Sequence, residues 1–388
     1  MKQEIKRNDY NRFKCTADKC SLTCCQEWRI AVDETTYEKW KGKYLTTTKQ
    51  GKSHNELELC KCTKKEEWDY SVVMNEDKTC PFLNDQKLCR IVIEHGELYL
   101  SETCTTFPRQ TNEFKERTEY TLASCCPEVV DLLYYTKEEV RFGDAINKEE
   151  SEDILLEVRD MMINFMHQKT YSIPQKLMMI FYALLDLNSN AELSIKLIKD
   201  TQSQKYIASL AKARQGMDFR AEDTIYETNE LFLDIIENYT QQNLYTSYLE
   251  SIGELGETLD RIYSEEELCD KMLGFEEVFI KYEELINNYI VSELLGNLLM
   301  DDMNLEDLIV AYQWIVIEYS VIKQSIFLKW LTKDSKGIDY ATVRDYIVVM
   351  SRITGYDQVD IKEYLENSFE SLLWEWGYLA LVVGNAKI

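Results

Sequence analysis

The sequence predicts a mainly α-helical protein, in which a small, cysteine-rich and loop-rich N-terminal module is attached to an all-helical body. Three observations lead to this fold class. Eleven of the twelve cysteines lie between Cys15 and Cys126. Three of the four prolines lie before residue 146, each close to a cysteine. Long amphipathic helical patterns begin after that point. We therefore expect two domains, residues 1–145 and residues 146–388.

Regular secondary structure is sparse in the predicted N-terminal module. Helical periodicity is weak there except near "DETTYEKWK" and "CPEVVDLLYYTKEEV". The stretch "CRIVIE", followed by "HG" and "ELYL", predicts a β-hairpin, because two runs rich in apolar residues flank a glycine-containing turn. The remainder of the module is expected to be loops.

The second half of the chain has the spacing of amphipathic helices. Apolar residues recur at steps of one, three and four along one stretch: Ile154, Leu155, Val158, Met161, Met162, Phe165 and Met166. Comparable patterns cover residues 173–187, 228–252, 265–299, 304–331, 340–356 and 359–376. The apolar tail "LLWEWGYLALVV" is interpreted as core rather than as a membrane-surface element.

Composition and charge restrict the function. The formal charge of −25 disfavours nucleic-acid binding, since an acidic surface repels phosphates. The same charge would attract a basic partner or a lysine-bearing substrate, or would serve only to keep helical faces soluble. The first residues lack a secretory h-region, and no window of about 18 apolar residues suggests a transmembrane segment. We expect a soluble, cytoplasmic protein, with peripheral membrane contact and oligomeric state left open.

Common catalytic motifs are missing from the sequence. No G-x-G-x-x-G follows a strand, no P-loop occurs, and "GELG" lies within a helical pattern. Only three histidines are present, His54, His95 and His167, and each is interpreted as a surface or loop residue. Cys269 lies on an apolar helical stripe and is expected to pack in the core.

The crowded cysteines are the strongest chemical signal. Cys15, Cys20, Cys24 and Cys25 form a C-x4-C-x3-C-C cluster, and further cysteines follow in "CPFLNDQKLC", "ETCTTFPRQ" and "SCCPE". In a reducing compartment such crowding indicates metal or redox chemistry more often than disulfides. Groups of four thiolates select tetrahedral zinc or an iron–sulfur cluster. Spacing alone leaves both metals open.

These motifs resemble a known family. The stretches "FKCTADKCSLTCCQEWRIAVDETTY", "CPFLNDQKLCRIVIEHGELYLSETCTTFPR" and "YTLASCCPEVVDLLY" strongly resemble the flagellin lysine N-methylases and the broader zinc- or iron-chelating cysteine-cluster family. The helical stretches at residues 275–295 and 312–331 are similar to that family as well. The resemblance implies a protein-lysine N-methyltransferase that uses S-adenosylmethionine, acts on flagellin and carries a [4Fe–4S] cluster.

The resemblance also suggests which residues act. The matching cysteines, expected as metal ligands, are Cys15, Cys20, Cys24, Cys25, Cys80, Cys89, Cys104 and Cys126, whereas Cys60, Cys62 and Cys125 look like local extras. Eight positions exceed the four that one cluster needs, so a second site stays open.

Several residues near these cysteines are candidates for direct chemistry. Glu102, Glu128, Tyr99 and Tyr120 are candidates to contact the lysine amine, which must lose a proton before it can accept a methyl group. Arg109 is a candidate to bind a cluster sulfur or the cofactor carboxylate. The alternative function is a structural-zinc binding module, an adaptor for a flagellin-like partner without catalysis.

Overall fold

The computed structural model describes residues 2–49, 52–143, 153–215, 221–355, 358–369 and 376–383. The chain is mainly helical, as predicted, and it divides into two compact units. The helical unit comprises Met1–Arg12, Thr111–Cys125 and Val129–Ile388, and the cysteine unit comprises Phe13–Gln110 and Cys126–Glu128. The boundary predicted between residues 145 and 146 lies outside the described residues and stays a prediction.

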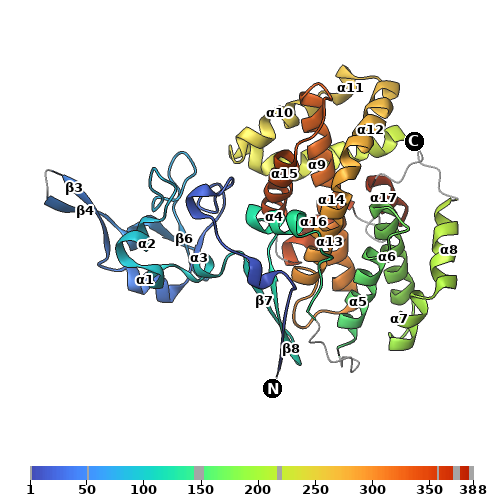
Figure 1. Ribbon diagram of the computed structural model, residues 1–388, viewed down its shortest axis with the longest axis horizontal. Helices are drawn as coiled ribbons and strands as arrows, with labels where there is room; N and C mark the ends of the chain where they lie inside the picture. The colour runs from blue at the N-terminus through green and yellow to red at the C-terminus, as the bar shows by residue number, and fades with distance from the viewer. Residues whose placement is uncertain are drawn as a thin grey trace. The chain divides into compact units, whose positions relative to one another are not determined.

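The cysteine unit combines short helices with short strands (Figure 1). Its helices are α1 (Glu34–Trp40), α2 (Arg90–His95) and α3 (Glu102–Thr106). One sheet has the strand order β2 (Ala31–Val32), β6 (Tyr70–Val72), β5 (Thr63–Lys65), and an antiparallel hairpin joins β3 (Tyr44–Lys49) to β4 (Lys52–Glu58). Such short elements leave much of the unit as loops, which agrees with the prediction.

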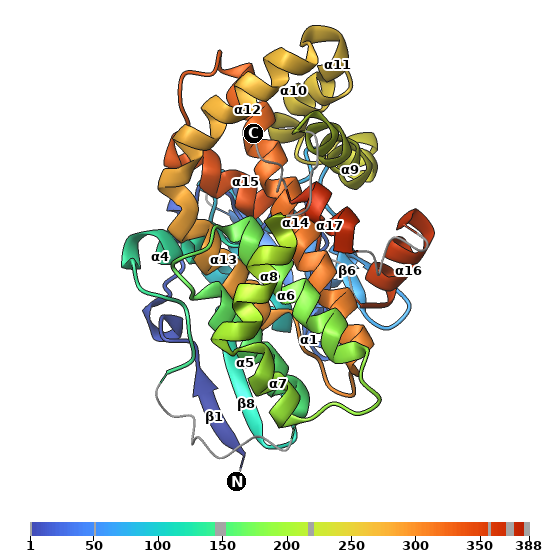
Figure 2. The same ribbon diagram turned by 90° about the vertical axis from the view of Figure 1, so that its right-hand side faces the viewer.

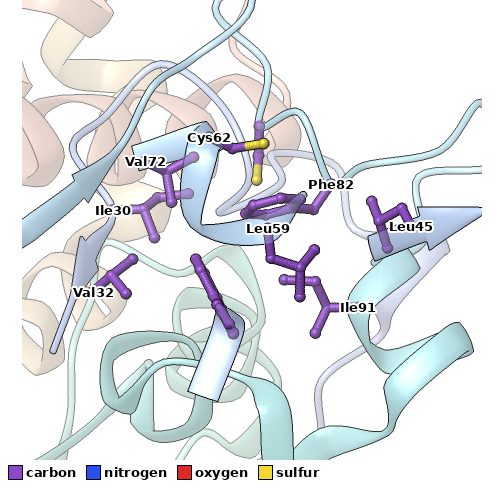
Figure 3. Close-up of a cluster of buried hydrophobic side chains, with 10 residues drawn as sticks. Ile30, Val32, Leu45, Leu59, Cys62, Val72, Phe82 and Ile91 are labelled. Atoms are coloured by element: carbon purple, nitrogen blue, oxygen red, sulfur yellow. The ribbon is translucent and has the colours of Figure 1, made fainter. Parts of the chain in front are cut away.

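A small apolar core holds these loops together (Figure 3). Trp40, at the end of α1, is 2% exposed, and its ring meets Phe82 edge-on at 5.3 Å between centroids. Its indole N–H donates to the backbone oxygen of Tyr99 at 2.7 Å, so the polar edge of this buried ring is satisfied. Helix α1 begins at Asp33, whose side chain accepts from the backbone N–H of Thr36.

The predicted hairpin at residues 89–100 is wrong. This stretch forms α2, followed by a 3-10 turn at Glu97–Tyr99. Gly96 ends the helix with φ of 89° and donates to the carbonyls of Ile91 and Val92, so the glycine is a helix stop rather than a hairpin turn. The apolar run predicted a strand, whereas in the structure the same run forms α2 and buries Ile91 in the core.

A three-stranded sheet that the sequence did not reveal lies mostly in the helical unit, since the first two residues of its third strand, Arg109 and Gln110, belong to the cysteine unit. Its order is β1 (Gln3–Lys6), β8 (Arg117–Leu122), β7 (Arg109–Glu113), and β1 runs parallel to β8 (Figure 2). Strand β8 is almost entirely buried, and its Glu119 receives a bidentate ion pair from Arg159 of α5 at 2.7 and 2.6 Å. A buried carboxylate is tolerated here because this guanidinium neutralises it.

The helices of this unit follow the predicted amphipathic patterns, with additional helices between them. Their bounds are α4 (Pro127–Thr136), α5 (Ile154–Met166), α6 (Ile173–Asn188), α7 (Ile195–Thr201), α8 (Gln204–Gln215), α9 (Ala221–Gln241), α10 (Thr246–Gly256), α11 (Leu259–Ile262), α12 (Glu265–Phe279), α13 (Glu283–Gly296), α14 (Leu305–Thr332), α15 (Tyr340–Ile353), α16 (Gln358–Phe369) and α17 (Trp376–Val382). The single pattern predicted over residues 228–252 is split, because Asn243 and Tyr245 adopt left-handed backbone conformations.

Helix α14 is the centre of the helical unit. It spans 28 residues, is buried on nearly all sides, and packs against α6, α9, α10, α12, α13, α15, α16 and α17 (Figure 1). A helix that is apolar all round is expected in such a position. Asn304 caps its start by accepting from the backbone N–H groups of Glu306 and Asp307.

The apolar tail agrees with its interpretation as core where it is described. Leu379, Ala380, Val382 and Val383 are all buried, whereas residues 372–375 lie outside the described part of the chain. Among the described residues, no helix has the length and apolar character needed to cross a membrane.

Candidate functional site

All eight cysteines predicted as metal ligands lie in the cysteine unit, whereas Cys125 belongs to the helical unit. Four of the eight, Cys25, Cys80, Cys89 and Cys104, come within electrostatic range of one another, and we call them the thiol cluster. The backbone N–H of Cys80 donates to the carbonyl of Cys25 at 2.8 Å, which joins the opening cysteine motif to the "CPF" motif.

Local structure fixes the other two members of the thiol cluster. Cys89 precedes α2, and a backbone bridge pairs it with Leu83. Cys104 lies in α3, and its backbone N–H donates to the hydroxyl of Ser101, the residue that caps this helix. The thiol cluster is therefore built from four separate segments of the unit.

Burial and mutual repulsion raise the pKa values of three of these thiols, those of Cys80, Cys89 and Cys104. Burial raises the pKa of Cys80 well above its usual range, and Cys25, Cys104 and Cys89 raise it further. Cys89 shows the same direction, with burial as the main cause and Cys25 as a contributor. Cys104 retains an exposed surface, but protein atoms surround its sulfur closely enough that desolvation raises its pKa to about 11. Without a cation, these groups are held as neutral thiols.

Backbone N–H groups oppose this effect at two of the sulfurs. The N–H of Phe82 lies close to the sulfur of Cys80, and those of Ile91 and Val92 lie close to the sulfur of Cys89; each lowers the pKa of its thiol. Backbone dipoles directed at sulfur stabilise thiolates and tune a bound metal centre. These backbone dipoles would therefore stabilise thiolates at Cys80 and Cys89.

The side-chain positions do not themselves define a metal site. Within the described part of the chain, no three His, Cys, Asp or Glu side chains are placed to hold one metal ion. Four thiolates on one zinc ion would lie about 3.8 Å apart, given Zn–S bonds of about 2.3 Å and tetrahedral geometry. An iron–sulfur cluster binds each cysteine through a different iron, so its ligands are spread more widely.

Other cysteines of the unit differ in their exposure. Cys15 is exposed, Cys126 is buried before α4, and the thiol of Cys20 donates to the carbonyl of Leu22. Cys62 packs in the apolar core, where burial raises its pKa to about 11 (Figure 3). A second metal site among the remaining predicted ligands stays a prediction.

The predicted catalytic residues are divided between the two units. Glu102 is exposed at the start of α3, and its backbone N–H donates to the carboxylate of Asp33. Glu128 accepts from the hydroxyl of Thr16 at 2.9 Å. Tyr120 belongs instead to the helical unit, in β8, where Lys6 lies over its ring at 5.4 Å. The predicted roles of these three residues stay predictions.

The predicted cofactor contact, Arg109, is exposed at the start of β7. Its guanidinium lies over the ring of Phe13, 4.9 Å from the centroid. Tyr99, the fourth residue named beside the cysteines, is partly buried, and its carbonyl holds the Trp40 indole.

The sequence interpretation missed a pair of buried carboxyl groups. Glu293 of α13 and Glu318 of α14 are 4% and 5% exposed. Burial raises the pKa of both groups, and the charge of Glu318 raises that of Glu293 further. Two carboxyls that repel each other away from water retain at least one proton near neutral pH. Buried groups with shifted pKa values are common at functional sites.

Polar side chains surround this pair. The hydroxyl of Thr354 donates to Glu318 at 2.9 Å, and Tyr289, whose hydroxyl lies 3.1 Å from that of Ser351, is also beside it. Asn297 donates to the carboxylate of Glu293. Such a network satisfies the buried oxygens, yet it does not remove their mutual repulsion.

An arginine from the N-terminal segment approaches the same region. The fully buried guanidinium of Arg7 donates to Asp9, to the hydroxyl of Ser292 at 2.5 Å and to the carbonyl of Leu122 at 3.0 Å. Its positive charge lowers the pKa of Glu293, but burial has the larger effect. One feature of the sequence points to Glu318, because this charged residue interrupts the apolar run "LIVAYQWIVIEY".

Comparisons with known proteins agree with the resemblance seen in the sequence. The family described as "FliB lysine N-methylase C-terminal domain" matches residues 159–382, more than half of the chain. The "Flagellar biosynthetic protein FliU" of Salmonella muenchen is 29% identical over 132 residues, covering 34% of this chain and 77% of FliU.

Two proteins named "Lysine-N-methylase" are similar over shorter shares of their length. The protein of Salmonella typhimurium is 31% identical over 122 residues and that of Salmonella choleraesuis is 30% identical over 121 residues. In each case the match covers 31% of this chain and 30% of the relative. No solved structure matches this chain.

Proposed function

This chain belongs to the FliB lysine N-methylase family, and from this premise we propose that it transfers methyl groups from S-adenosylmethionine to lysine side chains of flagellin. The observation that carries the proposal is the family match over residues 159–382. The names of the similar proteins, "Lysine-N-methylase" and "Flagellar biosynthetic protein FliU", support both the reaction and the flagellar substrate.

The reaction places simple demands on the protein. A bond forms between the lysine nitrogen and the methyl carbon while the bond from that carbon to sulfur breaks, and S-adenosylhomocysteine leaves. The amine must first give up its proton, since lysine has a pKa near 10.4 and its ammonium form has no free electron pair. Glu102, Glu128 and Tyr120 remain our candidates for contacting the amine, and Arg109 for the cofactor. The net charge of −25 favours the approach of a lysine-bearing partner.

We also propose that the thiol cluster holds a [4Fe–4S] cluster through Cys25, Cys80, Cys89 and Cys104. Two features of the site support this. Thiolates at these four positions would repel one another, so positive charge is needed to ionise them, and four cysteines match the four irons of such a cluster. When bound, such a cluster supplies that positive charge.

Methyl transfer is tested directly with the purified chain. Protein prepared without oxygen is incubated with flagellin and S-adenosylmethionine, and the flagellin is digested and sequenced by mass spectrometry. We expect methyl groups on lysine ε-amines and production of S-adenosylhomocysteine. Fully metal-loaded protein that leaves every flagellin lysine unmodified would overturn the proposed reaction.

The metal assignment has its own test. Iron, zinc and acid-labile sulfide are measured in the wild type, in Cys89→Ser and in the control Cys269→Ser, which changes a half-buried cysteine of α12. We expect about four irons and four sulfides per chain, a large loss in Cys89→Ser and no loss in the control. Stoichiometric zinc without sulfide would instead favour the structural-zinc adaptor.

A further inference from the structure

A cavity of about 820 Å³ in the helical unit differs in charge from the rest of the chain. The end of α5, the start of α6, the first turns of α13 and the segment 137–141 surround it. Four lysine or arginine side chains and four glutamates line it, although the whole chain has a charge of −25. A second cavity, between α9 and α10, is lined by acidic side chains and, among the described residues, by no basic one. The balanced lining of the first cavity is therefore a local feature.

Lys176 provides a buried cation at this cavity. The residue is 7% exposed, and its ammonium donates to the amide oxygen of Asn287 at 2.8 Å. Burial lowers its pKa, while Glu283 and Glu139, exposed residues that line the same cavity, act in the opposite direction. An ammonium has three donor hydrogens, so this group can bind a ligand carboxylate in addition to Asn287.

His167 provides a buried acceptor. Its Nε2 is shielded from water and has no hydrogen-bond partner within the described chain. The carbonyl of Val140 lies by the ring and acts as a hydrogen-bond partner, so the proton is on Nδ1. Burial lowers the pKa of this histidine, which keeps the ring neutral and leaves a lone pair on Nε2. That nitrogen can accept from an N–H or O–H group of a ligand.

The wall of the cavity is fixed in advance. Asn8 donates to the carbonyl of Glu139, and Asn288 donates to the carbonyl of Glu138, each at 3.1 Å. The N–H of Val140 also approaches the amide oxygen of Asn288, at 3.4 Å. Two side chains thus hold the segment 137–141 in place, as expected of a preformed ligand site.

We propose that this cavity binds S-adenosylmethionine, with the methionine carboxylate on Lys176 and the methionine ammonium beside Glu283. The proposal rests on the methyl-transfer function proposed above. A ligand that carries both a carboxylate and an ammonium matches a balanced set of charges, and the cavity volume is within the range used for cofactor-sized molecules. His167 accepts from a hydroxyl or amino group of the adenosine part, and Tyr171 offers an aromatic face to the base.

Calorimetric binding of two probes tests the assignment. S-adenosylhomocysteine carries the amino-acid part, whereas 5′-methylthioadenosine lacks it. We expect Lys176→Met to weaken binding of the first probe about tenfold or more, since a charge-assisted hydrogen bond is lost, and to leave binding of the second unchanged. Unchanged binding of the second probe also reports that the cavity is still folded. The control is Lys329→Met, another lysine whose pKa burial lowers, located in α14; it should bind both probes like the wild type.

The outcomes separate this proposal from the proposed function. If Lys176→Met binds S-adenosylhomocysteine as tightly as the wild type does, the cavity assignment is overturned. Methylation of flagellin by the wild type would in that case still support the proposed enzyme function. Equal weakening of both probes also overturns the assigned carboxylate contact. A wild type that binds neither probe and methylates no lysine overturns both proposals.

Discussion

Replacing Glu293 with glutamine tests the buried carboxyl pair without changing the shape of the side chain. Glutamine resembles the protonated acid, and its oxygen can still accept from Asn297. The substitution removes the ionisation of Glu293 and the repulsion that it has with Glu318. The pH dependence of stability then reports directly on how strongly the folded protein resists that ionisation.

The size of the effect follows from the pKa shift. Burial, together with Glu318, raises the pKa of Glu293 from 4.5 to about 8. Between these values the folded protein holds a proton that the unfolded chain has released, so stability falls as the pH rises. At about 1.4 kcal/mol per pKa unit, the full cost is roughly 5 kcal/mol. About 2 kcal/mol of this is lost between pH values of about 6 and 8.

Urea denaturation followed by far-ultraviolet circular dichroism provides the measurement. We expect the wild type to lose about 2 kcal/mol more than Glu293→Gln between the two pH values, so the variant becomes the more stable protein at the higher pH. Glu254→Gln, at an exposed position of α10, serves as the control and should follow the wild type. Parallel pH dependence of Glu293→Gln and the wild type would refute this account of the carboxyl pair.

Three further substitutions test the packing of the fold. Arg159→Met should lower the free energy of unfolding by about 3 kcal/mol, because Glu119 loses its bidentate partner; adding Glu119→Gln should restore most of it, and no recovery in urea denaturation would contradict the ion-pair explanation. Asn304→Ala should cost about 1 kcal/mol by uncapping α14, and Asn304→Asp should cost little in the same assay. Gly96→Ala should lower the midpoint of thermal unfolding, because alanine is strained at φ of 89°. In the control Gly143→Ala, the added methyl group would lie 3.7 Å from the backbone oxygen of Lys6, an ordinary contact, so the midpoint should not change.

The long helices were predictable because the spacing of apolar residues that predicts a helix lies within the helix itself. Apolar spacing over residues 304–331 corresponds to α14 almost to the residue, and the pattern at 154–166 corresponds to α5. The break between α9 and α10 was not predictable, since left-handed Asn243 and Tyr245 replace the glycine that would normally mark a helix end. Tertiary packing determines this turn.

The strands β1 and β8 of the helical unit were not predictable from the sequence. Strand β1 pairs with β8, more than a hundred residues further along the chain. Neither strand alternates cleanly between apolar and polar residues, because β8 is buried on both faces and carries Arg117 and Glu119 inside. Glu119 pairs with Arg117 of the same strand at 2.7 Å and with Arg159 of α5, and no pattern within the strand reveals the second partner.

The sequence predicts metal ligands among the cysteines, and this stays a prediction; the grouping of the thiols in space was not predictable. Cysteine crowding indicated metal ligands, yet the selection of Cys25, Cys80, Cys89 and Cys104 from the eight predicted depends on how four distant segments fold together. The opening motif contributes one member, Cys25. Spacing along the chain describes only cysteines that are close in sequence. It does not show which cysteines from distant loops come together in the folded protein.

The thiol cluster and the carboxyl pair share one physical property: each brings together groups that repel when ionised. Apolar side chains of similar size would stabilise either place better, since burying an unpaired charge costs several kcal/mol. Glu318 lies in the central helix α14, between the buried residues Ile317 and Tyr319. A carboxyl group in such a position lowers stability whatever its role. Its presence therefore indicates a role in chemistry or binding. Under the proposed function, the polar groups around Glu293 and Glu318 are therefore further candidates for contacting the lysine amine.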